Sequence, residues 1–119
     1  MTPARFRKLA LALEGVTEVA HFDRRAFRTK RKIFATLGAD GRVNLVVEPV
    51  DRRDALLESF PEAFHDLGGW TRLGYVAVDL AEVDDGLFAE LLADAHRAAL
   101  PKPKAARTRA APPAKTRKR

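Results

Sequence analysis

A chain of 119 residues that is 46% hydrophobic and 32% charged has room for one folded domain with a single modest core. The chain contains no cysteine, which excludes disulfides, thiol nucleophiles and cysteine metal sites. No apolar run approaches the roughly 20 residues that span a bilayer, so we expect a soluble, cytoplasmic monomer with no membrane partner.

The net charge of +6 is unevenly distributed along the chain. Residues 100–119 carry eight Lys/Arg and no acid. Residues 1–42 have ten cations against four acids, whereas residues 43–99 have four cations against twelve acids. Basic character in the folded part is therefore confined to its first 42 residues.

The first expected element is a helix that begins at Thr2-Pro3, an N-cap followed by a proline in the first turn. The residues that recur at helical spacing and predict its buried stripe are Phe6, Leu9, Ala10 and Leu13. Gly15 is expected to end this helix in the left-handed conformation.

Four strands are predicted next, over residues 17–22, 26–30, 33–38 and 42–48. A three-residue loop that closes with a left-handed Gly41 would join the last two strands. The pairs that this loop predicts, with all six side chains on the core face, are Leu37 with Val43, Ala35 with Leu45, and Ile33 with Val47. The opposite face would then carry Lys32, Phe34, Thr36, Asn44, Val46 and Glu48.

A second helix is expected over residues 52–60, capped by Asp51. Its inward-facing side chains would be Leu56, Leu57 and Phe60. An irregular connection over residues 61–70 and a last strand over residues 74–80 follow.

The final helix is predicted to begin after an Asp84 cap and to stop at Pro101. Its buried stripe would consist of Leu87, Phe88, Leu91, Leu92, Ala95 and Ala99. Residues 101–119 contain no large apolar residue and are expected to be disordered. The chain is thus predicted to have one α+β domain, residues 1–100, with an antiparallel sheet, helices on one face and the order α-β-β-β-β-α-β-α.

Four segments of this domain, in the order FRKLALALEGVTEVAHFD, AFRTKRKIFATLG, RVNLVVE and WTRLGYVAVDL, resemble the MmcQ/YjbR family over residues 5–100. The resemblance implies a fold related to that of bacterial frataxin and the DNA-binding function described for that family. The sequence departs from the family pattern at two places. Lys30-Arg31 stands at a hairpin tip that is usually glycine-rich, where a positive φ would favour glycine. The basic segment 101–119 lies outside the pattern.

Six cations fall within residues 24–32, on strands and turns that adjoin one another, with Asp23 as the nearest acid. A charge run of this kind is either a solvated surface or a polyanion-binding one. The residues predicted to contact DNA phosphates are Arg24, Arg25, Arg28, Lys30, Arg31, Lys32, Arg42, Lys102, Lys104, Arg107, Arg109, Lys115, Arg117, Lys118 and Arg119. Arg28 is ambiguous, because it would oppose Ile33 at the edge of the core.

A second candidate site is a ligand cleft formed by His21, Trp70, Arg72 and Tyr75. Aromatic rings beside an arginine can stack a base, although packing of the connection on the sheet would equally account for them. His21, His65 and His96 share no metal-ligand spacing. A frataxin-like iron site would need an acidic first helix, whereas this one carries Arg5, Arg7 and Lys8. We therefore expect no metal and no other cofactor.

The acids Asp79, Glu82, Asp84 and Asp85 lie near the start of the last helix, where capping explains them. Ser59 is the only serine, and no base or oxyanion loop lies near it in the sequence. The sequence therefore predicts a non-enzymatic DNA-binding protein, with DNA as its partner. The alternative is a protein- or small-ligand-binding module with a cleft near Trp70.

Overall fold

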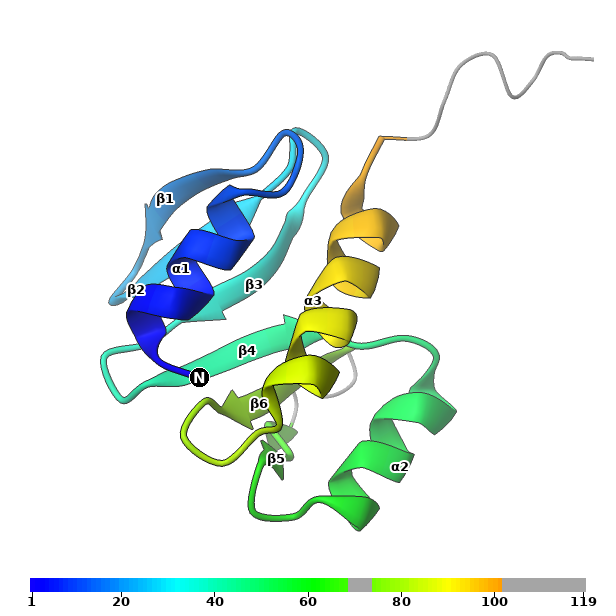
Figure 1. The fold of residues 1–119 in the computed structure, drawn as a ribbon. Coiled ribbons are helices and arrows are strands. Elements are labelled where there is room, and N and C mark those ends of the chain that lie inside the picture. The colour runs from blue at the N-terminus through cyan, green and yellow to red at the C-terminus, as the bar shows by residue number, and fades with distance from the viewer. Residues whose placement is uncertain (69–73, 102–119) are drawn as a thin grey trace, which may run out of the picture.

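The computed structural model describes residues 1–68 and 74–101. Figure 1 shows its elements, which are α1 (Pro3–Leu11), β1 (Thr17–His21), β2 (Arg24–Arg28), β3 (Ile33–Leu37), β4 (Arg42–Val46), α2 (Val50–Ser59), β5 (Phe64–His65), β6 (Tyr75–Asp79) and α3 (Asp85–Ala99). The six strands form one antiparallel sheet in the order β1-β2-β3-β4-β6-β5. The α+β class is confirmed. The short β5 is an addition, since the sequence predicted an irregular connection there.

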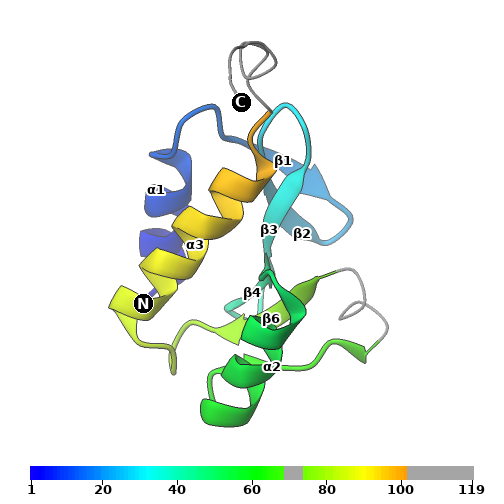
Figure 2. The same cartoon turned by 90° about the vertical axis from the view of Figure 1, so that its right-hand side faces the viewer.

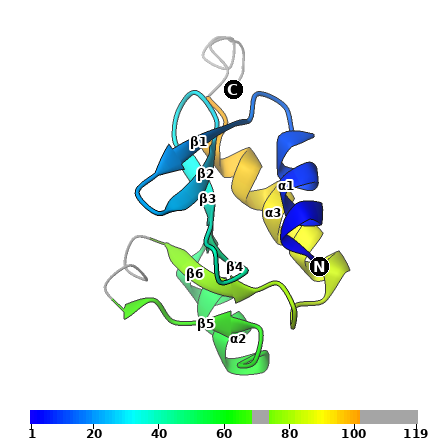
Figure 3. The ribbon, with the colours of Figure 1, turned by 90° about the vertical axis from the view of Figure 1, so that its left-hand side faces the viewer.

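The two faces of the sheet have different surroundings. Figures 2 and 3, which view the fold from opposite sides, place α1 and α3 together on one face. The helix α2 lies beside the β5 end of the sheet and is joined to α3 by an ion pair between Arg52 Nη1 and Asp94 Oδ2 at 2.8 Å. We call the other side, which the described helices leave uncovered, the open face.

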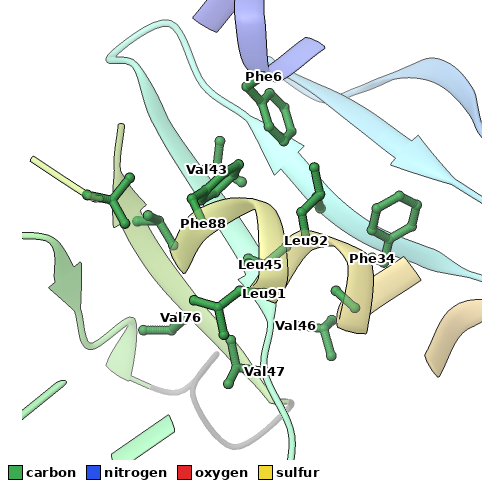
Figure 4. Packing of buried hydrophobic residues seen from close by; sticks show 14 of the residues in the cluster. Phe6, Phe34, Val43, Leu45, Val46, Val47, Val76, Phe88, Leu91 and Leu92 are labelled. Atoms are coloured by element: carbon green, nitrogen blue, oxygen red, sulfur yellow. The ribbon is translucent and has the colours of Figure 1, made fainter. Parts of the chain in front are cut away.

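The core lies between the sheet and the helices α1 and α3, as Figure 4 shows. Phe6 of α1 contacts two rings edge to face, with ring centroids 5.0 Å from Phe27 of β2 and 5.7 Å from Phe88 of α3. The predicted stripe of α3 is buried except for Leu87, which is half-buried, and Asp84 caps the helix by accepting a hydrogen bond from Leu87 N. The apolar side of α3, which the helical spacing of its residues predicted, therefore packs against the sheet.

The β3–β4 hairpin confirms most of the predicted register. Leu37 pairs with Val43 and Ala35 pairs with Leu45. Gly41 closes the loop with a φ of +80°, the left-handed conformation that glycine adopts without steric cost.

The other end of β3 differs from the prediction. On the β2 side, Phe27 pairs with Ala35 and Arg28 pairs with Ile33, so that Phe34 is the extra residue of a β-bulge. Phe34 is fully buried on the helix-covered face, with its ring 5.8 Å from that of His96 in α3. Ile33 instead lines a pocket on the open face. The prediction that put Ile33 in the core and Phe34 opposite is therefore wrong, because strict alternation does not anticipate a bulge.

The strand and helix ends show smaller differences. Strand β2 begins at Arg24, two residues earlier than predicted. In α1 the Thr2 cap is confirmed, but the helix ends at Leu11, before the left-handed Gly15. The predicted Asp51 cap is wrong, since α2 has Pro49 at its N-cap and Asp51 within its first turn. Phe60, predicted to face inward, is 44% exposed.

Candidate nucleic-acid interface and open-face pocket

The turn between β2 and β3 is bonded to the end of α3. The Thr29 hydroxyl donates a buried hydrogen bond of 2.6 Å to the Ala99 carbonyl, and it accepts from the backbone N–H groups of Arg31 and Lys32. The Arg31 guanidinium donates to the carbonyl of Ala98. One hydroxyl thus closes the turn and holds it against the last residues of the helix.

We call Lys30, Arg31 and Lys32 the basic tip. Lys30 and Arg31 are exposed and Lys32 is half-buried. Within residues 1–68 and 74–101, the two lysine ammonium groups make no hydrogen bond or ion pair. None of the three residues has a positive φ, so this tip does not require glycine.

The basic tip lies beside the start of the C-terminal segment. A cavity of about 420 Å³ is lined by Glu14, Gly15, Thr29, Lys30, Leu100 and Pro101. Pro101, the last residue described, therefore shares a cavity with Lys30, and Lys102 follows Pro101 in the sequence. The predicted disorder of residues 102–119, and the cations in them, lie outside the described residues.

The six cations of residues 24–32 do not form one surface. Opposed residues of an antiparallel pair lie on one face, and successive residues alternate between faces. Arg25 and Phe27 accordingly lie on the helix-covered side, while Arg24 and Arg28 lie on the open face. Arg28 opposes Ile33, as the sequence predicted, and its Nε donates to the Thr29 carbonyl. Arg42 begins β4 as an exposed residue.

Arg25 takes part in an ion-pair cluster at the β1 edge. The Glu18 carboxylate accepts from Arg7 Nε at 2.6 Å and from Arg25 Nε at 2.7 Å, and its side chain is 9% exposed. Burial alone would raise the pKa of Glu18, but the hydrogen bonds from Arg25 and Arg7 outweigh it and hold that pKa below its ordinary value. Arg25 is thereby committed to a structural contact.

Arg24 extends across the open face and is held there by three hydrogen bonds. Its Nε donates to Thr36 Oγ1 at 2.9 Å, and its Nη2 donates to the carbonyls of Thr36 and Arg42. A Cβ atom on Gly38 would lie 2.3 Å from Arg24 Nη1. The absence of a side chain at Gly38 therefore allows this guanidinium to lie against the hairpin.

The open face has a pocket of about 350 Å³ next to Arg24. Its lining residues are His21, Phe22, Asp23, Arg24, Ile33, Thr36, Asn44 and Tyr75. Phe22 stands at the rim, 91% exposed, with its ring 4.9 Å from that of His21. Its φ of +59° is the only positive φ of a non-glycine residue in the described part of the chain. The pocket thus combines an exposed aromatic rim with polar side chains.

Two residues of the predicted cleft, His21 and Tyr75, line this pocket, while Trp70 and Arg72 lie outside the described residues. The Tyr75 hydroxyl donates to the Ile33 carbonyl at 3.1 Å, and burial raises the pKa of this phenol. Sequence analysis missed Phe22, Asn44, Thr29 and Gly38. For Phe22, the available signal is the two-residue turn that it forms with Asp23, whereas the predicted strand 17–22 includes it.

Residues 1–68 and 74–101 hold neither a metal centre nor a membrane span. The described residues hold no group of three or more acidic or histidine side chains placed to bind a metal ion. His96 is mostly buried, and its Nε2 lies 2.7 Å from the Glu14 carbonyl, a structural contact. Within the part of the chain described here, no helix has the length and hydropathy to cross a bilayer.

Comparison with known proteins identifies the family and the fold. The family model described as YjbR matches residues 11–98. A crystal structure of the Deinococcus radiodurans protein DR2400, described as having a DUF419 domain, superposes with a TM-score of 0.69. That protein is 21% identical, and the match covers 79% of this chain and 75% of that one. No curated protein matches the chain.

Proposed function

The chain belongs to the YjbR family, and we propose that it is a non-enzymatic protein that binds DNA through phosphate contacts. In this proposal the basic tip and the Lys/Arg-rich segment after Pro101 bind the same DNA molecule. The observation that carries the proposal is the cavity shared by Lys30 and Pro101. It puts Pro101, the residue from which the basic segment continues, next to the basic tip.

The contacts that fix this arrangement are internal to the fold. The Thr29–Ala99 hydrogen bond and the Arg31–Ala98 hydrogen bond both join the turn to α3. Lys30 and Lys32 remain able to reach phosphate, because among the described residues nothing pairs with their ammonium groups. The segment 102–119 adds eight cations with no acid. Together they supply the multiple Lys/Arg contacts whose counterion release drives non-specific binding to DNA.

The charge distribution of the rest of the fold would orient the complex. The twelve acids of residues 43–99 include those of α2 and of the first turn of α3, which lie in Figure 1 at the end of the molecule away from the β2–β3 turn that carries the basic tip. Repulsion between these acids and DNA would leave the end with the basic tip as the side of approach. Phosphate contacts carry no sequence information, so one copy should bind DNA of any sequence.

The test is a titration of labelled duplex DNA at several salt concentrations with full-length variants. In a plot of the logarithm of the binding constant against the logarithm of the salt concentration, five or six phosphate contacts give a slope of about −5. Replacing the eight cations after Pro101 with glutamine should remove this contribution to the slope. Lys30→Glu/Lys32→Glu should reduce affinity and lower the slope by about 2. Arg5→Glu/Lys8→Glu on α1 changes the net charge equally and serves as the control.

Two outcomes would contradict the proposal. If the wild-type chain does not bind duplex DNA at low salt, the function is wrong. If the basic-tip variant behaves like the α1 control, the tip is a solvated surface and the segment after Pro101 acts alone.

A further inference from the structure

We propose that the open-face pocket binds an unpaired nucleobase, so that the protein prefers single-stranded over duplex nucleic acid. This inference rests on the proposed function, since the strand that supplies the base would be held by the same cations. The ligand it names is a flat, hydrogen-bonding aromatic ring.

The first observation is the conformation of Phe22. It is one of two residues in the β1–β2 turn, where His21 pairs with Arg24. A positive φ at such a turn is normally supplied by glycine, asparagine or aspartate. A bulky aromatic residue with φ +59° is an unfavourable choice, and its ring is 91% exposed to water. Strained residues of this kind cluster at active sites and ligand clamps, where the surrounding structure holds them in place.

The second observation is how the aromatic rim is built. The Phe22 ring stands edge to face with His21, at 4.9 Å and an interplanar angle of 70°. This leaves a face of the Phe22 ring open to a flat partner. Stacking of a base on an exposed aromatic ring is the usual way in which proteins hold single strands, and it tolerates any sequence.

The third observation is the polar floor. Asn44 lines the pocket and, within the described residues, its side-chain amide makes no hydrogen bond. An asparagine amide offers one acceptor and two donors, which match the edge of a base such as adenine. Thr36 beside it is already committed to Arg24, whereas the Asn44 amide is left to read a ligand. The pocket volume of about 350 Å³ is at the small end for organic ligands and suits one ring system.

The position of the pocket connects it to the basic tip. Strand β2 runs from Arg24 at the pocket to Arg28 near the turn, a distance of about 13 Å at the usual rise per residue. Arg28 lies on the same open face and precedes the basic tip by two residues. A single strand lying along β2 would therefore meet Arg28 and Lys30 with its phosphates while one base enters the pocket. A paired base is enclosed in its stack and would not reach Phe22.

The test compares a short single strand with the blunt duplex of the same sequence, titrated against the full-length protein at raised salt. Phe22→Gly should weaken single-strand binding by about 5- to 150-fold and leave duplex binding unchanged. Its melting temperature should not fall, because glycine suits the turn. Phe60→Ala removes a phenylalanine that is 44% exposed, just after the C-terminal end of α2, and should leave both affinities unchanged.

A second variant and a second ligand make the result decisive. Asn44→Ala should reduce the differences in affinity among homopolymeric single strands. In the wild-type protein, the NMR signal of the Asn44 side-chain amide should shift when the single strand is added. Equal affinities of Phe22→Gly and wild type for the single strand would overturn the inference. So would tighter binding of nucleoside monophosphates than of the strand. Duplex binding that persists in either case would leave the proposed function standing.

Discussion

The two faces of the sheet are built on different principles. On the helix-covered face, rings such as Phe6, Phe27 and Phe34 are fully buried among apolar neighbours. On the open face, Arg24 is held by three hydrogen bonds, and Phe22 stands exposed in a strained turn. Burial of apolar area stabilises the first face, whereas the second keeps polar and aromatic groups accessible. We therefore expect substitutions on the covered face to act on stability and those at the rim of the open face to act on binding.

The largest predicted effect tests which face each residue of the bulge occupies. Phe34→Ala should lower the free energy of unfolding by about 3–5 kcal/mol, because it empties a buried site against His96. Ile33→Ala should cost no more than about 1.5 kcal/mol, since Ile33 is only half-buried. Urea denaturation of both variants measures the difference. A larger loss of stability for Ile33→Ala than for Phe34→Ala would mean that Ile33 faces the core and that the strand has no bulge.

The next effect concerns the contact between the end of α3 and the turn that carries the basic tip. Thr29→Val keeps the shape of the side chain but leaves the buried Ala99 carbonyl without its donor. An unsatisfied buried acceptor costs about 1–3 kcal/mol, so the variant should unfold at lower urea concentration by that amount. Thr17→Val, an exposed position on β1, is the matched control and should change little. Similar effects at the two threonines would mean that the turn is not held by α3.

Sequence reasoning succeeded at most of the features that are determined locally, the Asp51 cap excepted. The Thr2 and Asp84 caps, the stripe of α3 and the left-handed Gly41 all depend on residues within a few positions of one another. It failed where contacts with residues far away in the sequence determine the local structure. The bulge at Phe34 depends on packing against His96, which is 62 positions away in the sequence. The bond from Thr29 to the Ala99 carbonyl likewise spans 70 positions.

The candidate site was predicted in the same uneven way. The cations of residues 24–32 were identified correctly as a cluster in the sequence, but the late start assigned to β2 concealed that Arg24 and Arg25 alternate between faces. A strand that begins at Arg24 predicts that Arg24 and Arg25 point to opposite faces of the sheet. Pairing of Arg25 with Glu18 depends on the register of the β1–β2 hairpin, in which Glu18 opposes Phe27, and that register follows from a β2 that begins at Arg24.

A smaller effect is expected at the contact between Gly38 and Arg24. Gly38 has no positive φ, so alanine suits its backbone, yet the new Cβ would displace the guanidinium from Thr36 and Arg42. The loss of these partly exposed hydrogen bonds should cost about 1 kcal/mol. In an Arg24→Ala background the same substitution should cost less, because only Asp40 Oδ1, 2.9 Å from the new Cβ, then remains in the way. A double-mutant cycle measures this coupling, and additive costs would contradict the contact.

The smallest predicted effect is the pH dependence that Glu18 confers at the edge of the covered face. Its pKa in the folded state lies below the ordinary value of 4.5, so the unfolded chain binds more protons as the pH falls through this range. The contribution of Glu18 to stability is therefore fully present above about pH 5 and is lost as the pH falls below 4.5 toward the folded-state pKa. Because Arg7 and Arg25 are both more than half exposed, Glu18→Gln should cost only about 0.5–1 kcal/mol at neutral pH. The difference in the free energy of unfolding between variant and wild type should shrink as the pH is lowered through this range. Urea denaturation at each pH measures it. A difference that stays constant with pH would show that the carboxylate charge contributes nothing and that Arg25 is available for other partners.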